Sequence, residues 1–151
     1  MALDVPRRVI FLDIDGVLAP IRHWDRYGDL EPACVEVLNE IVTHTSAEVV
    51  VSSTWRHGRT VAELQVMLEE EGFTGCVVDK TPAGAPGEGR GDEIAAWLAA
   101  HTVGGYVIID DHAIHGEALG DRLVVTHPGC GLRPSDAPRV IEILMRFGAA
   151  A

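Results

Sequence analysis

The sequence predicts an α/β domain in which helices cover both faces of an open, doubly wound parallel sheet, giving three layers. Two observations lead to this prediction. Short runs rich in Val, Ile and Leu, typical of strands buried on both faces, alternate along the chain with segments whose apolar residues recur at helical spacing. The connections between these segments are short, as expected for strand–helix–strand units of a parallel sheet.

The first half of the chain supplies three predicted strands and two predicted helices. The strands are the apolar runs at 8–13 (RVIFLD), 47–54 (AEVVVSST) and 75–79 (GCVVD). A helix at 31–45 has Pro32 in its first turn and an apolar face made by Val35, Leu38, Ile41 and Val42. A second helix at 60–72 ends at Gly72 and turns Leu64, Met67 and Leu68 inward.

The second half continues the alternation. A loop rich in Gly and Pro at 81–91 precedes a helix at 92–101, whose inward residues are Ile94, Trp97 and Leu98. Strands are predicted at 104–111 (GGYVIIDD) and 121–127 (DRLVVTH), and a closing helix at 135–147 has Ser135 or Asp136 as its N-cap. No repeat or long linker divides the chain, so 1–151 is predicted to be one domain.

Composition and charge narrow the possible functions. The chain is 47% hydrophobic and 23% charged, as in globular proteins, and its net charge is -11. So acidic a protein is not expected to hold duplex DNA or an anionic membrane across a broad surface. The three cysteines (Cys34, Cys76 and Cys130) lack metal-site spacing and are expected to be reduced, small core residues. No signal peptide or spanning helix is recognisable, which predicts a cytoplasmic protein.

Acid and hydroxyl residues end three of the predicted strands. They are Asp13 and Asp15 after the first, Ser52 to Thr54 at the end of the second, and Asp110 and Asp111 at the end of the strand at 104–111. The carboxyl ends of parallel strands share one edge of the sheet, where ligands bind, so these side chains are expected to converge. Repulsion between Asp13 and Asp15 is expected to raise at least one of their pKa values when no cation is bound.

Carboxylates gathered in this way favour a hard divalent cation, and Mg²⁺ is the predicted cofactor, with Asp13, Asp15, Asp110 and Asp111 as candidate ligands. Magnesium needs only one or two of them, which leaves one carboxylate to attack phosphorus and another to carry protons. His112 and His115 resemble a zinc pair, but no Cys or third His is spaced to complete such a site. A structural or solvent-facing role is therefore expected for both.

Four segments resemble, in order, the four motifs of the haloacid dehalogenase (HAD) superfamily of phosphohydrolases: FLDIDGVL, VVVSST, GRGDEIAAWL and VIIDD. The resemblance implies a HAD-like, Rossmannoid fold. It also implies that Asp13 is the nucleophile that forms an aspartyl-phosphate. Asp15 would be the acid/base, with its backbone carbonyl on the metal. Asp111 would be a metal ligand, and Asp110 would either bind the metal as well or hold Asp111.

The resemblance leaves two phosphate-binding positions open. Ser53 is the first choice for the hydroxyl that binds phosphate, and Ser52 is the alternative. Arg90 stands where the third motif usually has Lys, and a planar guanidinium is not equivalent to a point charge. Lys80 is the competing candidate for this cation.

The chain is also similar to the HAD domain of Swiss Army Knife RNA repair proteins, and the stretch between its first two motifs is too short for a cap domain. This resemblance implies a phosphatase acting on nucleic-acid 3′ ends, that is, a phosphorylated polynucleotide as partner. In such a protein Arg56 would bind a second phosphate and Trp24 would stack on a base.

Three alternatives remain at this point. The acidity of the chain favours a phosphatase acting on small nucleotides or sugar phosphates, whereas the absence of a cap disfavours it. A signalling domain with a phosphorylated aspartate would place its acid pair after the first strand and a lone acceptor after the third, the reverse of the order here. A binding domain without catalysis is the third alternative, although all the expected catalytic residue types are present.

Overall fold

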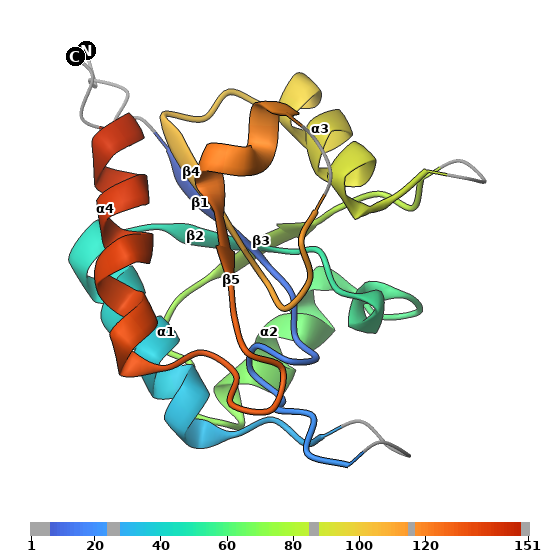
Figure 1. The fold of residues 1–151 in the computed structure, drawn as a ribbon. Coiled ribbons are helices and arrows are strands. Elements are labelled where there is room, and N and C mark those ends of the chain that lie inside the picture. The colour runs from blue at the N-terminus through green and yellow to red at the C-terminus, as the bar shows by residue number, and fades with distance from the viewer. Residues whose placement is uncertain (1–6, 24–27, 85–87, 115–116, 149–151) are drawn as a thin grey trace.

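The computed structural model describes residues 7–23, 28–84, 88–114 and 117–148. Its centre is a five-stranded parallel sheet in the order β3-β2-β1-β4-β5 (Figure 1). The strands are β1 (Arg8–Leu12), β2 (Glu48–Val51), β3 (Val77–Lys80), β4 (Gly105–Asp110) and β5 (Leu123–Val125). The α-helices are α1 (Pro32–Thr45), α2 (Val61–Glu69), α3 (Arg90–Ala100) and α4 (Ala137–Gly148). The predicted doubly wound α/β fold is confirmed, and no separate cap is present among the described elements.

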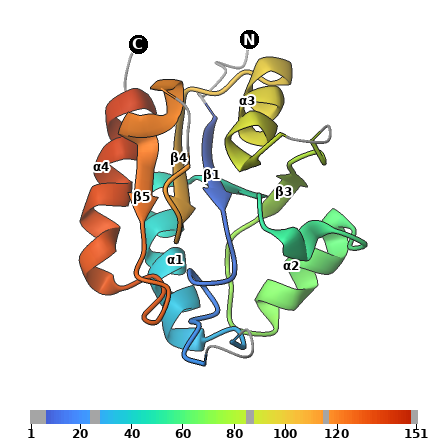
Figure 2. The same ribbon diagram turned by 45° about the vertical axis from the view of Figure 1, so that its right-hand side comes forward.

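The helices form two layers, one on each face of the sheet (Figures 1 and 2). Residues of α1, α2 and α4 share one core cluster with one face of the strands, including Leu38, Leu64 and Leu144. On the other face, Ile94 and Trp97 of α3 pack on Val9 and Phe11 of β1 and their neighbours. Both faces of the central strand are therefore buried, which explains why its sequence is a continuous apolar run.

The strand order creates a switch point at β1. The chain moves outward from β1 through β2 to β3, then returns through α3 to β4 on the other side of β1 and ends at β5. In open parallel sheets, the crevice at such a point, outside the carboxyl ends of the strands, is where ligands bind.

The structure corrects three details of the predicted elements. α3 begins at Arg90, two residues earlier than expected, because Gly89 and Asp92 form a capping arrangement in which the Gly89 N–H donates to the Asp92 carboxylate at 3.0 Å. Ser135 and Asp136 do not cap α4: they lie in a 3₁₀ turn (Pro134–Asp136), where Asp136 accepts the Arg133 N–H at 2.9 Å. Of the three cysteines, all unpaired, only Cys34 is in the core.

The described residues form four α-helices, and crossing a bilayer would require one that is both long enough and apolar enough. None of them meets both conditions.

The core on the α3 face gives a first prediction, for Phe11→Ala. The Phe11 ring is fully buried and makes edge-to-face contacts with Trp97 and Tyr106, at centroid distances of 5.4 and 5.8 Å. Removing it leaves a cavity beneath α3, so the free energy of unfolding should fall by about 3–5 kcal/mol in urea denaturation. Val66→Ala, at a half-exposed site on α2, is the control and should change it by less than about 0.5 kcal/mol. A loss below about 1 kcal/mol for Phe11→Ala would contradict this packing.

Candidate active site

The strand ladders bring the polar strand ends to one level. Leu12, the last residue of β1, is paired with Val51 of β2 on one side and Ile109 of β4 on the other. One step further, the Asp13 N–H donates to the Ile109 carbonyl at 3.0 Å, and the Ser52 N–H donates to the Leu12 carbonyl at 2.9 Å. Asp13, Ser52 and Asp110 therefore converge as predicted, because the parallel registers fix them next to each other.

A tight turn carries Asp15 back over the end of β1. The Ile14 carbonyl accepts the N–H groups of the three residues 17–19 at 2.9 to 3.1 Å. Gly16 has a φ of +78°, and a Cβ at this position would collide with the carboxylate of Asp111. A side chain at Gly16 would thus be both strained and obstructed, and its absence lets the first acid motif approach the fourth.

Arg90 links the acids of β1 and β4. Its Nη1 lies 2.6 Å from Oδ2 of Asp110 and 3.3 Å from Oδ2 of Asp13. Asp110 is fully buried and Asp13 nearly so, whereas the Arg90 side chain is 25% exposed. The acids raise the pKa of Arg90 against the opposing effect of its burial, so this cation remains charged beside them.

The expectation of a raised pKa is confirmed for both acids of the first motif, but the cause differs from the one predicted. Burial raises the pKa of Asp13 to about 7, the negative charge of Asp110 adds to this effect, and the charge of Arg90 opposes it. Burial also raises the pKa of Asp15, while a hydrogen bond with the Trp55 side chain lowers it and the charge of Asp111 raises it. Desolvation and the acids of β4, rather than repulsion between Asp13 and Asp15, dominate these shifts.

The donor set fits a divalent cation. Ligand atoms of Asp110, Asp111 and His112 all lie within 4.8 Å of one another. Oδ1 of Asp15 is buried and has no hydrogen-bond partner among the described residues. Carboxylate oxygens in this number suit Mg²⁺ better than a softer metal.

His112 belongs to this cluster, although it was expected to have only a structural or solvent-facing role. Its backbone N–H donates to Oδ1 of Asp110 at 2.9 Å, and its Nδ1 lies 2.8 Å from Oδ1 of Asp111. The side chain is 80% exposed, so it holds Asp111 from the solvent side. His115 lies outside the described residues.

The two candidate hydroxyls have different partners. Oγ of Ser53 accepts the Trp55 N–H at 3.2 Å and thereby caps the short 3₁₀ helix at Thr54–Arg56. Oγ of Ser52 is buried and has no hydrogen-bond partner among the described residues. A buried hydroxyl that is level with Asp13 and lacks a partner is the better candidate for receiving a ligand oxygen, which favours Ser52 over the first choice, Ser53.

The two candidates for the third-motif cation, Arg90 and Lys80, also have different partners. Arg90 contacts Asp13, whereas Nζ of Lys80 donates to the backbone carbonyls of Arg59 at 2.6 Å and Arg56 at 3.3 Å. Lys80 thus secures the loop after β2. Arg90 therefore lies beside Asp13, whereas the Lys80 ammonium is bonded to the loop that follows β2.

The prediction that Arg56 binds substrate is not compatible with its environment. Its side chain is 3% exposed, and its guanidinium is bonded to three backbone carbonyls and to Glu93. Four of the five N–H donors of this guanidinium are thus engaged inside the protein, and its burial keeps the cation away from a second phosphate. Trp24, the other predicted substrate contact, lies outside the described residues.

Sequence reasoning missed Thr126, a residue that supports the site. Thr126 follows β5, donates its hydroxyl to the Gly16 carbonyl at 2.7 Å and its N–H to the Asp110 carbonyl at 2.9 Å. A polar residue ending an apolar strand was the signal for Ser52, and the same signal marks Thr126 in RLVVT.

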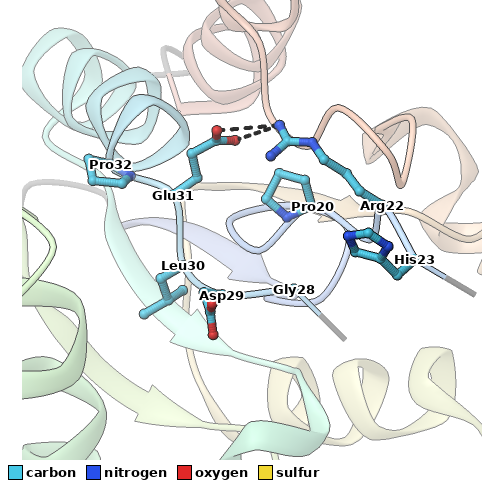
Figure 3. Close-up of a pocket in the computed structure, with 8 residues that line it drawn as sticks. All are labelled: Pro20, Arg22, His23, Gly28, Asp29, Leu30, Glu31 and Pro32. Carbon is cyan, nitrogen blue, oxygen red and sulfur yellow. Dashed lines mark hydrogen bonds and ion pairs between the residues drawn. The ribbon is translucent and has the colours of Figure 1, made fainter. Parts of the chain in front are cut away.

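Besides a hollow of about 450 Å³ next to Arg56, Lys80 and Trp97, two hollows lie near these segments in the described part of the chain. One of about 450 Å³ opens beside Arg90, Asp110 and His112 and continues over the start of α3 to Ile114. The other, of about 400 Å³, lies in the loop between β1 and α1, where Arg22 makes an ion pair with Glu31 at 3.1 Å (Figure 3). Its described lining residues include none of the four acids, so the hollow beside Arg90 is the one that offers room for a ligand at the site.

Comparison with known proteins agrees with this geometry. A family model described as the HAD domain in Swiss Army Knife RNA repair proteins matches residues 9–137, which includes all four motif segments. A search of curated proteins finds no match to the chain. Because the matched segment covers most of the sequence, the chain belongs to this family of HAD domains.

Proposed function

We propose that the protein is a Mg²⁺-dependent phosphomonoesterase that works through an aspartyl-phosphate on Asp13 and acts on the 3′ ends of nucleic acids. The observation that carries the proposal is the contact of Asp13 with Arg90, on a strand end level with the unpartnered hydroxyl of Ser52. Transfer of a phosphoryl group to a carboxylate requires a nucleophile, a cation and a hydrogen-bond donor close together, and these three groups would supply them. Membership of a HAD family supports hydrolase chemistry in general.

Each side chain has a distinct task in the proposed reaction. The Asp13 carboxylate attacks phosphorus, and the bond to the leaving oxygen breaks as Asp15 donates its proton to that oxygen. Asp15 then takes a proton from water, which attacks the acyl phosphate and releases inorganic phosphate and the Asp13 carboxylate. The raised pKa of Asp15 suits a group that must first hold a proton and later accept one.

Arg90 and Ser52 would hold the phosphoryl oxygens, and Asp111 and Asp110 would hold the metal together with Asp13 and the Asp15 backbone carbonyl. The bound Mg²⁺ would supply positive charge that stabilises the charge developing on the phosphoryl group. Arg90 also makes an ion pair with Asp110, whose Oδ2 lies 2.6 Å from its Nη1.

The proposed nucleic-acid substrate rests on the family description and on the exposed setting of the site. The hollow beside Arg90 is lined on one side by the start of α3 and on the other by residues 112–114, and no cap element covers it among the described residues. The rival substrate class, small nucleotides or sugar phosphates, is favoured by the net charge of -11, which repels a long polyanion.

The nucleophile can be tested with Asp13→Asn. This change removes the attacking carboxylate while keeping its size, so turnover of p-nitrophenyl phosphate with Mg²⁺ should fall at least roughly 10⁴-fold. Far-UV circular dichroism should be unchanged. Asp121→Asn, at an exposed position, is the matched control and should retain full activity. If Asp13→Asn keeps more than about one part in a hundred of the activity, Asp13 is not the nucleophile.

Metal binding should be linked to pH near neutrality. In the metal-free protein the pKa of Asp13 is raised to about 7, because burial of the carboxyl and the nearby Asp110 and Asp111 outweigh Arg90 and the backbone hydrogen bond at Ile14. Below pH 7 this carboxyl therefore holds a proton, which a cation must displace, so Mg²⁺ affinity should fall as the pH drops from 7 to 5. The slope should approach about tenfold per pH unit.

Calorimetric titration with Mg²⁺ at pH 6, in buffers that differ in ionisation enthalpy, measures the protons released. Wild type should release close to one proton per cation bound. Asp13→Asn should release distinctly fewer, since it has no carboxyl to deprotonate. Wild-type binding without proton release would show that Asp13 is already ionised or that it takes no part in the metal site.

The substrate class can be tested by comparing kcat/KM for a 3′-phosphorylated oligonucleotide with kcat/KM for nucleoside 3′-monophosphates and sugar phosphates. We expect the oligonucleotide to be preferred by at least about tenfold, since neighbouring nucleotides can add contacts that a monomer lacks. A matched 5′-phosphorylated oligonucleotide serves as the control for end specificity. Equal or better turnover of the small phosphates would instead support the small-molecule phosphatase.

A further inference from the structure

The Arg56 guanidinium joins three elements beneath the candidate site. Its Nε donates to the Thr81 carbonyl just beyond β3 at 2.8 Å. Its Nη1 donates to the carbonyls of Ser53 at 2.9 Å and Ser52 at 3.3 Å, at the end of β2. Its Nη2 donates to Oε2 of Glu93 in α3 at 2.7 Å.

These four contacts of the Arg56 guanidinium form a junction between β2, β3 and α3, and their chemistry makes it rigid. A guanidinium is planar and offers donors in fixed directions, so four acceptors together determine its position. Glu93 is itself held, because its Oε2 also accepts the Gly84 N–H at 2.9 Å. The backbone of Arg56 is fixed separately by its N–H bond to the Ser53 carbonyl at 3.1 Å and by Lys80.

The junction lies between the two groups assigned to the phosphoryl oxygens. Ser52 is the residue whose carbonyl Arg56 binds, and Arg90 lies three residues before Glu93, on the same side of α3. α3 and β2 also share an apolar core cluster, which includes Val50, Ile94 and Trp97. The contact between Arg56 and Glu93 is thus a direct mechanical connection from the end of β2 to the helical turn that carries Arg90.

We propose that Arg56 is a positioning residue of the reaction, which fixes the Ser52 hydroxyl and the Arg90 guanidinium relative to each other so that both meet one phosphoryl group. This inference rests on the proposed phosphatase function. In this role Arg56 does not bind the substrate directly. Its guanidinium instead donates to backbone carbonyls and to the Glu93 carboxylate of the protein itself. A displacement of the order of 1 Å between such groups is enough to reduce turnover about 100-fold.

The test uses Arg56→Lys and Glu93→Gln in the full chain. Lysine keeps the charge but cannot reach the four acceptors in their fixed directions, and glutamine keeps the size of Glu93 but not its charge. For both variants we expect kcat/KM with p-nitrophenyl phosphate to fall about tenfold to 100-fold and the Kd of orthovanadate, a phosphoryl analogue, to rise by at least about fivefold. The double variant should be no worse than Arg56→Lys alone, because both changes break the same connection.

Two matched controls are Arg139→Lys and Glu36→Gln, at exposed positions on α4 and α1, which should bind vanadate as wild type does. Circular dichroism and thermal unfolding establish that each variant is folded at the assay temperature, and Glu93→Gln carries the test alone if Arg56→Lys does not fold. A residue that only stabilised the fold would lower the unfolding temperature and leave kcat/KM and vanadate affinity at control values. That result would overturn the proposal.

The proposal and the function on which it rests fail in different ways. If wild type neither hydrolyses phosphomonoesters nor binds vanadate with Mg²⁺ present, the phosphatase function is wrong and the role of Arg56 in it falls too. If wild type does both and the folded variants match the controls, the phosphatase stands and the positioning role alone is refuted.

Discussion

The site depends on one constraint: the parallel sheet brings carboxylates together at its edge and buries them, so their negative charge must be compensated. Asp13 and Asp110 end adjacent strands, and both are nearly or fully excluded from water. Ionised carboxylates in such surroundings require a cation or a proton. Arg90 supplies one positive charge at 2.6 and 3.3 Å, and the pKa of Asp13, raised to about 7, shows that this charge does not fully compensate. The remaining demand is what makes a divalent cation a natural occupant.

The fold and the convergence of the acids could be predicted because both follow from local pattern. A continuous apolar run such as RVIFL has only one environment that suits it, a strand covered on both faces. Once several such runs are parallel, their ends must share an edge, and the residues that follow Leu12, Val51 and Ile109 become neighbours without any knowledge of side-chain packing. Asp13, Ser52 and Asp110 were predictable for this reason.

The sequence could not decide questions that depend on the direction of a side chain. Successive residues at a strand end point to opposite sides, so choosing between Ser52 and Ser53 requires the residue at which the strand ends and the partner each hydroxyl finds. Arg56 and Lys80 are near the site in sequence, but their cationic ends turn towards backbone carbonyls just beyond β3 and in the loop that follows β2. Which carbonyls a cationic side chain can reach is a property of the assembled sheet and cannot be inferred from one strand at a time.

The net charge of -11 sets a condition on any polynucleotide that this site accepts. Long-range repulsion disfavours a strand lying along the surface, so under the proposed function affinity would come from short-range contacts of the terminal phosphate and the nucleotides next to it. Because Arg56 and Lys80 are engaged with the protein's own carbonyls, they add little to a basic surface that would hold the polymer. Recognition in the proposed phosphatase would therefore be confined to the terminal phosphate and the nucleotides next to it, which fits removal of a terminal phosphate better than binding along a strand.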